Sequence, residues 1–255
     1  MIEFSWPSGR AGGILVADNA LDTEVCRNFL NYASSVIDVV GTPGKTISGV
    51  RLDHKNSTDM VISHITIQTE HGRDVQPMLR TFEVEVLKAI SACVSHYRHQ
   101  TRALWEWNNI VDSGFQVQRY KPCDGYYREH YDSAPWIPQT SHRVLSVVIY
   151  LNTVEVGGET EFPLHETSVS PVIGRICLFP SNFTHPHSGN PSFSQEKWII
   201  STFLSSHDTD TTSTFKTIDE LNTPTHTSHT HDHFDPEDMF EWTVEENHGH
   251  ETHQH

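Results

Sequence analysis

The stretch GYYREHYDSAPW, residues 125–136, holds a histidine and a carboxylate at a spacing that suits a metal ion. His130 and Asp132 are separated by one residue. Residues i and i+2 of a β-strand face the same side, so on a strand the imidazole and the carboxylate reach toward one ion. Because a His-x-Asp motif arises by chance in many loops, a metal site needs a third ligand from elsewhere in the chain.

A second stretch, FTHPHSGNPSFSQEKW at residues 183–198, offers that ligand. His185 and His187 are one residue apart, and Lys197 follows ten residues after His187. Two histidines and one carboxylate leave three positions of an Fe(II) ion open, the arrangement that non-haem iron enzymes use for O2 and a chelating co-substrate. Either histidine fits this triad by composition. The competing interpretation is a polar loop with two incidental histidines.

The elements around these stretches predict a β-rich unit after residue 110. Four short segments are rich in β-branched and aromatic residues and are separated by Gly, Pro, Asn and Ser. They are FQVQRY (115–120), RVLSVVIYLN (143–152), SVSPVIGRICLFP (168–180) and KWIISTFLS (197–205). No long helical pattern interrupts them, so we expect an all-β sandwich or jelly roll rather than alternating strands and helices.

Two helices are predicted before this unit. Apolar residues recur at helical spacing over residues 22–40, with Asp22 as the N-cap and Gly41 as the stop. The same pattern extends over residues 73–99. The segment 41–59 between them is polar and rich in turn formers, and it is predicted to be a loop.

The fold class predicted from these patterns is mostly β with N-terminal helices. The domain spans residues 1–205, with helical support at 1–110 and a β core at 111–205. Residues 206–255 form an acidic, histidine-rich tail with few aliphatic residues, which is predicted to be flexible.

The tail carries most of the charge of the chain. It holds twelve acidic residues, one lysine and nine of the nineteen histidines, and so accounts for −11 of the net charge of −16. Its segment HTSHTHDH (226–233) can capture divalent metal, but this composition implies no fixed geometry and favours a solvated tail. The chain has no basic stripe for a phosphate backbone, so we expect no nucleic-acid partner.

The cysteines and the N-terminal sequence indicate the cellular compartment of the protein. Cys26, Cys93, Cys123 and Cys177 are widely spaced without a CxxC pair, which is typical of reduced thiols. The N-terminal MIEFSWPSGRAGG lacks the apolar core of a signal peptide, and no segment has about 18 continuous apolar residues. The sequence therefore predicts a soluble, cytoplasmic protein that does not contact a membrane.

Three segments together resemble a known enzyme family. YKPCDGYYREHYD, RVLSVVIYLNTVEVGGETEFP and PVIGRICLFPSNFTHPHSGNPSFSQEKWIISTFL are similar to the iron(II)/2-oxoglutarate-dependent oxygenases of the prolyl 4-hydroxylase type, especially to compact bacterial and phage-borne members. The resemblance covers roughly residues 115–205. It implies a double-stranded β-helix (jelly roll) that binds Fe(II), 2-oxoglutarate and O2, with ascorbate as an accessory reductant.

The resemblance also assigns the metal ligands. His130 and Asp132 match the first two ligands of the family. The third ligand in such proteins precedes a small residue, a glycine and, further on, a basic residue. His187 is followed by Ser-Gly and lies ten residues before Lys197, so it fits this register.

His185 is the alternative third ligand, because it shares a strand face with His187 if the strand continues. Pro186 and the glycine that follows predict instead that a strand ends here, which favours His187. His185 is then expected to lie beside the metal site or on its substrate side.

Three residues are implied to hold the co-substrate. Lys197 is expected to pair with the distal carboxylate of 2-oxoglutarate, which needs a cation to offset its desolvation when buried. The resemblance places a co-substrate-contacting tyrosine at Tyr120, and Thr160 is a further candidate contact. Tyr127, Trp136 and Arg143 are candidates for a substrate groove; packing or exposure explains them equally well.

The reaction implied by the resemblance is hydroxylation of a C–H bond, with decarboxylation of 2-oxoglutarate to succinate and CO2. Asp132 supports hydroxylation, because related halogenases lack this carboxylate. A peptidyl proline in a protein or peptide is the expected substrate, with loops 41–59 and 133–142 beside its groove. The alternatives are a hydroxylase of a small molecule such as a free amino acid, and a non-enzymatic metal-binding β-sandwich that uses the tail histidines.

Overall fold

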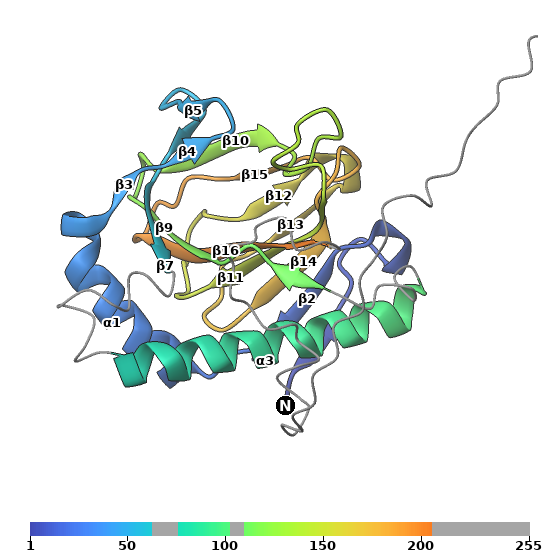
Figure 1. The fold of residues 1–255 in the computed structure, drawn as a ribbon, viewed down its shortest axis with the longest axis horizontal. Helices are drawn as coiled ribbons and strands as arrows, with labels where there is room; N and C mark the ends of the chain where they lie inside the picture. The colour runs from blue at the N-terminus through green and yellow to red at the C-terminus, as the bar shows by residue number, and fades with distance from the viewer. Residues whose placement is uncertain (63–75, 103–109, 206–255) are drawn as a thin grey trace, which may run out of the picture. The chain divides into compact units, whose positions relative to one another are not determined.

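Two antiparallel β-sheets face one another, and two helices lie along the outer side of the larger sheet (Figure 1). The computed structural model describes residues 1–62, 76–102 and 110–205. The predictions made for the tail at 206–255 lie outside the described residues. The helical elements are α1 (Thr23–Val40), α3 (Gln76–Thr101) and the 3-10 turns η1 (Arg10–Gly12) and η3 (Pro163–His165).

Within the described residues the larger sheet has nine strands and the smaller has five. In order across the larger sheet these are β1 (Glu3–Ser5), β2 (Leu15–Asp18), β14 (Ile176–Pro180), β11 (Arg143–Tyr150), β16 (Lys197–Ser205), β9 (Phe115–Tyr120), β7 (Thr58–Ile62) and β3 (Thr42–Pro43), with β8 (Val111–Asp112) beside β16. The smaller sheet runs β13 (Thr167–Val169), β12 (Thr160–Phe162), β15 (His187–Gly189), β10 (Tyr126–His130) and β6 (Lys55–Asn56). A separate hairpin pairs β4 (Lys45–Thr46) with β5 (Gly49–Val50).

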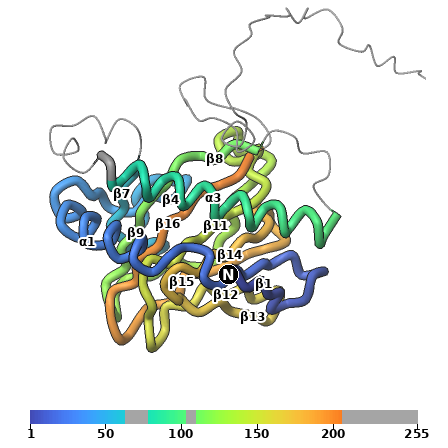
Figure 2. Tube along the Cα trace, turned by 90° about the horizontal axis from the view of Figure 1, so that it is seen from below, coloured from blue at the N-terminus to red at the C-terminus, as the bar shows by residue number. Residues whose placement is uncertain are grey.

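Helix α1 begins and ends where the sequence predicts. The Asp22 side chain accepts hydrogen bonds from the backbone N–H groups of Glu24 and Val25, and the Gly41 N–H donates to the carbonyl of Ile37. Phe29 on the buried face stacks on Phe82 of α3 with ring centroids 3.8 Å apart. Seen from below, α3 runs across the outer side of the larger sheet with α1 beside it (Figure 2).

The alternation of side chains along the central strands separates two cores. On β11, Leu145, Val147 and Ile149 pack into the large core that includes the buried faces of both helices. Val148 and Tyr150 point to the other side, into a smaller core between the sheets. Because successive residues of a strand face opposite sides, every second residue of β9, β11 and β16 is available to line the space between the two sheets.

This architecture confirms the mostly β fold with N-terminal helices, and it differs from the prediction in the first 62 residues. Strands β1 and β2 extend one edge of the larger sheet, and the expected loop 41–59 contains β3 to β6 and the start of β7. Each of these strands is only two to five residues long, so its alternation is too brief to detect in the sequence. Three of them pair with distant strands, β2 with β14, β6 with β10 and β7 with β9.

A second difference concerns the predicted strand 168–180. The structure divides it into β13 and β14, and Gly174 between them has a φ of +77°. A side chain at Gly174 would also meet the backbone oxygen of Leu21 at 2.3 Å, so only glycine fits this turn. Among the described residues, no helix has the length and apolar character needed to cross a membrane.

Candidate active site

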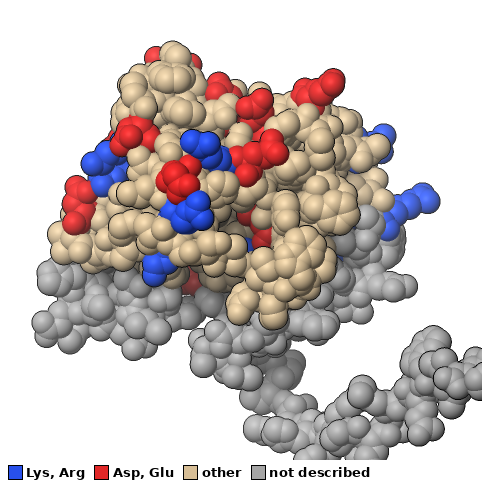
Figure 3. Space-filling model, turned by 90° about the horizontal axis from the view of Figure 1, so that it is seen from above, with Lys and Arg blue, Asp and Glu red and all other residues tan. Residues whose placement is uncertain are grey.

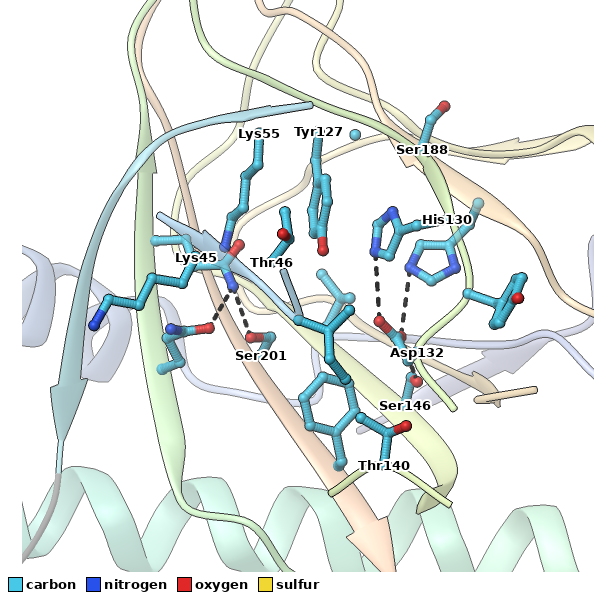
Figure 4. A pocket seen from close by; sticks show the side chains of 18 of the residues that line it. Lys45, Thr46, Lys55, Tyr127, His130, Asp132, Thr140, Ser146, Ser188 and Ser201 are labelled. Atoms are coloured by element: carbon cyan, nitrogen blue, oxygen red, sulfur yellow. Dashed lines mark hydrogen bonds and ion pairs between the residues drawn. The ribbon is translucent and has the colours of Figure 1, made fainter. Parts of the chain in front are cut away.

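Three side chains converge in the space between the sheets. Strands β10 and β15 are antiparallel neighbours in which His130 lies opposite His187. The Nε2 atoms of His130 and His187 lie 3.4 Å and 3.5 Å from the two carboxylate oxygens of Asp132 (Figure 4). One ligand atom from each of the three residues lies within 4.8 Å of the others, which is close enough for all three to bind one ion.

The local backbone differs from the sequence interpretation at both ends of this cluster. Strand β10 ends at His130, so Asp132 lies in the turn that follows and not on the strand. Its N–H donates to the carbonyl of Ser181 at 2.9 Å, which brings the carboxylate back toward His130. On the other side, β15 begins at His187, so Pro186 precedes a strand where we expected one to end.

Hydrogen bonds orient each of the three side chains. The Nδ1 atom of His130 lies 2.8 Å from the carbonyl of Arg128, and that of His187 lies 3.1 Å from the carbonyl of His185. When each Nδ1–H donates to its carbonyl, Nε2 is left as the metal-binding atom. The Ser146 hydroxyl donates to Asp132 at 2.6 Å and fixes the carboxylate.

The electrostatics of the cluster favour the protonation states that a metal ion requires. Burial raises the pKa of Asp132, but the neighbouring His187 and His130 and the Ser146 hydroxyl more than offset this and hold it well below its usual range. Burial lowers the pKa of His187 to about 4, although Asp132 opposes the shift. A neutral imidazole beside an ionised carboxylate is ready to bind a divalent cation, so these residues fit Fe(II).

A cavity of about 880 Å³ lies beside this cluster, between the two sheets. It is lined by all the residues that the sequence analysis assigned to the metal and the co-substrate: Tyr120, His130, Asp132, Thr160, His187 and Lys197. The structure therefore brings together side chains from five strands, β9, β10, β12, β15 and β16, and from the turn after β10. The volume is ample for a small dicarboxylate and part of a second substrate.

Lys197 opens β16 and is almost completely buried, with 2% of its surface exposed. Its ammonium donates to the carbonyls of Gly158 and Asn190, at 3.1 Å and 3.2 Å, and lies 4.7 Å from the centroid of the Tyr120 ring. Burial lowers the pKa of Lys197 to about 8, with Glu159 opposing the shift. A buried cation that lines the cavity is suited to bind a carboxylate.

The other two co-substrate candidates are buried polar groups. The Tyr120 hydroxyl donates to the side chain of Gln118 at 2.5 Å, and Thr160 shares a hydrogen bond of 2.7 Å with Tyr150. Burial, with the Asp59 carboxylate as the second cause, raises the pKa of Tyr120 well above its usual value. The phenol thus stays protonated and is a hydrogen-bond donor.

The side chain of His185 lies apart from the cluster. Its Nε2 lies 2.7 Å from the carbonyl of Gly12, and its ring stacks on His165 with centroids 4.3 Å apart. His185 contributes to the site through its backbone carbonyl, which faces Nδ1 of His187. The structure thus places His187, and not His185, with His130 and Asp132.

Of the three candidates for a substrate groove, Tyr127 and Arg143 line the cavity. Tyr127 stacks on His130 with ring centroids 3.6 Å apart, and Arg143 donates to the backbone carbonyl of Asp132 at 3.0 Å. Trp136 does not line the cavity; it is 69% exposed and packs edge-on against Tyr131.

Sequence reasoning missed two features of the cavity. Ser146 supports Asp132, and its signal was a polar residue in the middle of the apolar run RVLSVVIYLN. Lys55 also lines the cavity and is paired with Asp59, both buried. Nothing in the polar segment around Lys55 and Asp59 distinguishes them from exposed charges, because their burial comes from long-range pairing.

Comparison with known proteins agrees with this geometry. The model of the 2OG-Fe(II) oxygenase superfamily matches residues 115–205. Over 200 residues the chain is 38% identical to the "Putative prolyl 4-hydroxylase" of Acanthamoeba polyphaga mimivirus, with 72% of this chain and 70% of that protein covered. The chain belongs to the 2OG-Fe(II) oxygenase superfamily. Its similarity is to members of the prolyl 4-hydroxylase type, and it is a 2-oxoglutarate-dependent dioxygenase, as the sequence resemblance implied.

Solved structures share the fold of this 2OG-Fe(II) oxygenase. One is the viral collagen prolyl hydroxylase vCPH of Paramecium Bursaria Chlorella virus-1 in its 2OG complex, with a TM-score of 0.55 at 22% identity over 75% of this chain and 94% of that one. Another is a prolyl hydroxylase of Trichoplax adhaerens in complex with a peptide fragment of the hypoxia inducible factor oxygen degradation domain. Its TM-score is 0.57 at 19% identity, over 76% of this chain and 84% of that one. At these identities the likeness concerns the jelly-roll fold.

Proposed function

We propose that this protein hydroxylates a peptidyl proline in a reaction that depends on Fe(II) and 2-oxoglutarate. The observation that carries the proposal is the shared cavity, in which the triad His130, Asp132 and His187 lies with the buried cation Lys197. The triad suits an iron ion with open positions, and the lysine suits the distal carboxylate of a bound dicarboxylate.

The cavity residues have separate roles in binding the metal and the co-substrate. His130, Asp132 and His187 would hold Fe(II), which together with 2-oxoglutarate supplies the oxidative chemistry: 2-oxoglutarate, O2 and a C–H group give succinate, CO2 and a C–OH group. Lys197 binds the distal carboxylate, and Tyr120 and Thr160 offer hydroxyl groups to the co-substrate.

The peptide substrate is supported by the relatives. The sequence relative is named a prolyl 4-hydroxylase, and the Trichoplax enzyme was solved with a peptide bound. The face of this chain seen in Figure 3 mixes acidic and basic side chains and offers no strongly basic field for a nucleic-acid substrate. A small molecule such as a free amino acid is the second candidate, since the cavity volume alone admits either.

We further propose a reductant and a cellular compartment for the enzyme. Ascorbate serves as an accessory reductant, by analogy with the family. The enzyme acts in the reducing cytoplasm, which is supported by four cysteines that are all free, three of them buried.

The proposal is tested by incubating the full-length protein with Fe(II), 2-oxoglutarate, O2 and a library of proline-containing peptides. We expect a mass gain of one oxygen on a proline, with one succinate formed per hydroxylation, and no gain when His187 is replaced by alanine. Turnover of a free amino acid in place of every peptide would support the small-molecule candidate. In the non-enzymatic alternative, deletion of residues 206–255 abolishes specific iron binding, whereas the oxygenase proposal expects one iron site to remain.

Affinity for 2-oxoglutarate is expected to fall as the pH rises through about 8. The pKa of Lys197 is about 8 in the free protein, and a bound carboxylate raises it, so binding takes up a proton above this pH. We expect the Kd of 2-oxoglutarate to rise up to about tenfold per pH unit between pH 8 and 9, measured anaerobically from the iron-to-co-substrate charge-transfer band.

A monocarboxylate control isolates the contribution of Lys197 to this pH dependence. 2-Oxobutyrate chelates iron through the same two groups but has no distal carboxylate to meet Lys197. Its Kd is expected to stay flat between pH 7.5 and 9. A parallel rise for both ligands would show that the dependence arises at the metal and not at Lys197.

A further inference from the structure

A buried ion pair lies at one end of the active-site cavity. The ammonium of Lys55 donates to the carboxylate of Asp59 at 2.7 Å, and the two residues are only 1% and 4% exposed. The Ser57 hydroxyl donates to the other oxygen of the same carboxylate, also at 2.7 Å. We call Lys55, Ser57 and Asp59 the sheet clamp. Lys55 lines the cavity (Figure 4).

The sheet clamp joins the two sheets. Lys55 lies on β6 of the smaller sheet, where it is the register partner of Tyr127 on β10. Asp59 lies on β7 of the larger sheet, where it is the register partner of Gln118 on β9. Lys55 and Asp59 are four residues apart on one continuous segment, and their ion pair closes the point at which the chain passes from the smaller sheet to the larger one.

Each charged residue of the sheet clamp is linked to a tyrosine of the active site, one directly and one through Gln118. The Lys55 ammonium lies 5.1 Å from the centroid of the Tyr127 ring, which stacks on the ligand His130. On the other sheet, Gln118 accepts a hydrogen bond from the hydroxyl of Tyr120, whose ring lies against Lys197. One tyrosine thus borders the metal triad and the other borders the lysine proposed to bind 2-oxoglutarate.

Close packing surrounds the sheet clamp. A Cβ atom at Gly44, just before the β4–β5 hairpin, would meet the Ser57 hydroxyl at 2.2 Å and the Lys55 Cε at 3.0 Å. Only glycine allows this approach, and the Gly44 N–H donates to the carbonyl of Ser57 at 2.9 Å. Removing two charges from water is costly, and apolar residues of similar size often hold two elements together at least as well. Cohesion alone does not account for an ion pair here.

We propose that the Lys55–Asp59 pair is a positioning pair for the active site. It fixes the separation of the two sheets and thereby sets Tyr127 beside His130 and Tyr120 beside Lys197. The inference rests on the proposed function, since it assigns the pair to the placement of 2-oxoglutarate and the substrate. Neither residue is required to touch them.

The test replaces the pair by apolar residues of similar size, Lys55→Met with Asp59→Leu. This double variant avoids an unpaired buried charge, so we expect its Tm to lie within about 3 °C of wild type. The matched control makes the same replacements at the exposed pair of the same segment, Arg51→Met with Asp53→Leu, whose side chains are 54% and 67% exposed. The control is expected to behave as wild type in every measurement.

Two measurements separate positioning from cohesion. In metal-free protein labelled with 3-fluorotyrosine, we expect the fluorine resonances of Tyr120 and Tyr127, assigned by Phe substitution, to shift in the double variant and not in the control. In the anaerobic Fe(II) titration, we expect the Kd of 2-oxoglutarate to rise about tenfold while the charge-transfer band persists. Under turnover, less than half of the 2-oxoglutarate consumed should yield hydroxylated product.

Wild-type resonances and a wild-type Kd in a stable double variant would show that the pair is only cohesive and overturn the inference. If the double variant does not fold, Ser57→Ala is used instead, because it removes one hydrogen bond to Asp59. We expect the fluorine resonances of Tyr120 and Tyr127 to shift in this variant too. Unshifted resonances would overturn the inference. Absence of a charge-transfer band in the wild type would count against the proposed function, and the metal-free resonances would still decide the role of the pair.

Discussion

Replacing His187 by alanine is expected to abolish the charge-transfer band that Fe(II) and 2-oxoglutarate form in the wild-type protein. The loss of a group that only orients a metal ligand typically costs 10- to 100-fold in affinity or activity, and the loss of a ligand itself costs more. We therefore expect turnover of 2-oxoglutarate to fall by more than about a thousandfold. An anaerobic titration of Fe(II) in the presence of 2-oxoglutarate measures the band without any knowledge of the second substrate.

His185→Ala is the matched control for this experiment. It removes a histidine two residues away whose ring contacts Gly12 and His165, and it leaves the carbonyl that faces Nδ1 of His187 in place. We expect one equivalent of iron and the full band at 10 °C, where a loss of stability from the missing buried ring does not unfold the protein. A band that survives His187→Ala and disappears in His185→Ala would reverse the assignment of the third ligand.

The central strands were predictable because their patterns are long. Segments 143–152 and 197–205 have ten and nine residues and are rich in β-branched and aromatic side chains, and they pair as β11 and β16 in the middle of the larger sheet. Helix α1 was predictable to within one residue, because the Asp22 cap and the Gly41 stop are local interactions. In both cases the interactions that determine the element can be read from the local sequence: the cap and stop of the helix, and the run of apolar side chains along each strand.

The N-terminal strands were not predictable for the opposite reason. Strand β6 has two residues and β7 has five, and they acquire their conformation from β10 and β9, about fifty to seventy residues further along the chain. The burial of Lys55 and Asp59 follows from that pairing. A lysine and an aspartate four residues apart in a polar segment are otherwise typical of an exposed surface.

The active site also combines features that the sequence predicts with features that depend on long-range contacts. Spacing in the sequence pointed to His130 and Asp132, and the family resemblance pointed to His187. The structure brings the three side chains together, but the physical reasons differ from those we expected. Asp132 reaches the histidines through a turn held by Ser181, and not from a shared strand face. Ser146, which fixes the carboxylate, is contributed by β11, and no spacing rule relates it to the motif.

Replacing Lys197 by methionine is expected to weaken 2-oxoglutarate binding by several hundredfold. Methionine has similar length and keeps the packing against the Tyr120 ring, but it leaves the distal carboxylate buried without a cation. Removing one partner of a buried charge pair costs about 2–5 kcal/mol, which corresponds to roughly 30- to 5,000-fold in Kd. The measurement is the Kd of 2-oxoglutarate from the anaerobic charge-transfer titration, with Lys121→Met, an exposed neighbour of Tyr120, as the control variant.

A second ligand separates the loss of the cation from damage to the site. 2-Oxopentanoate has the same chelating groups and chain length as 2-oxoglutarate but ends in a methyl group. In the wild type, the methyl end of 2-oxopentanoate removes water from the Lys197 ammonium and offers no hydrogen-bond partner in return. In Lys197→Met, the methionine side chain packs against this methyl group. The variant should therefore bind 2-oxopentanoate at least as well as the wild type does. A reversal of preference between the two ligands would identify Lys197 as the carboxylate partner. An equal loss for both would mean that the variant had disturbed the metal triad, and the distal carboxylate would then have to be bound elsewhere in the cavity.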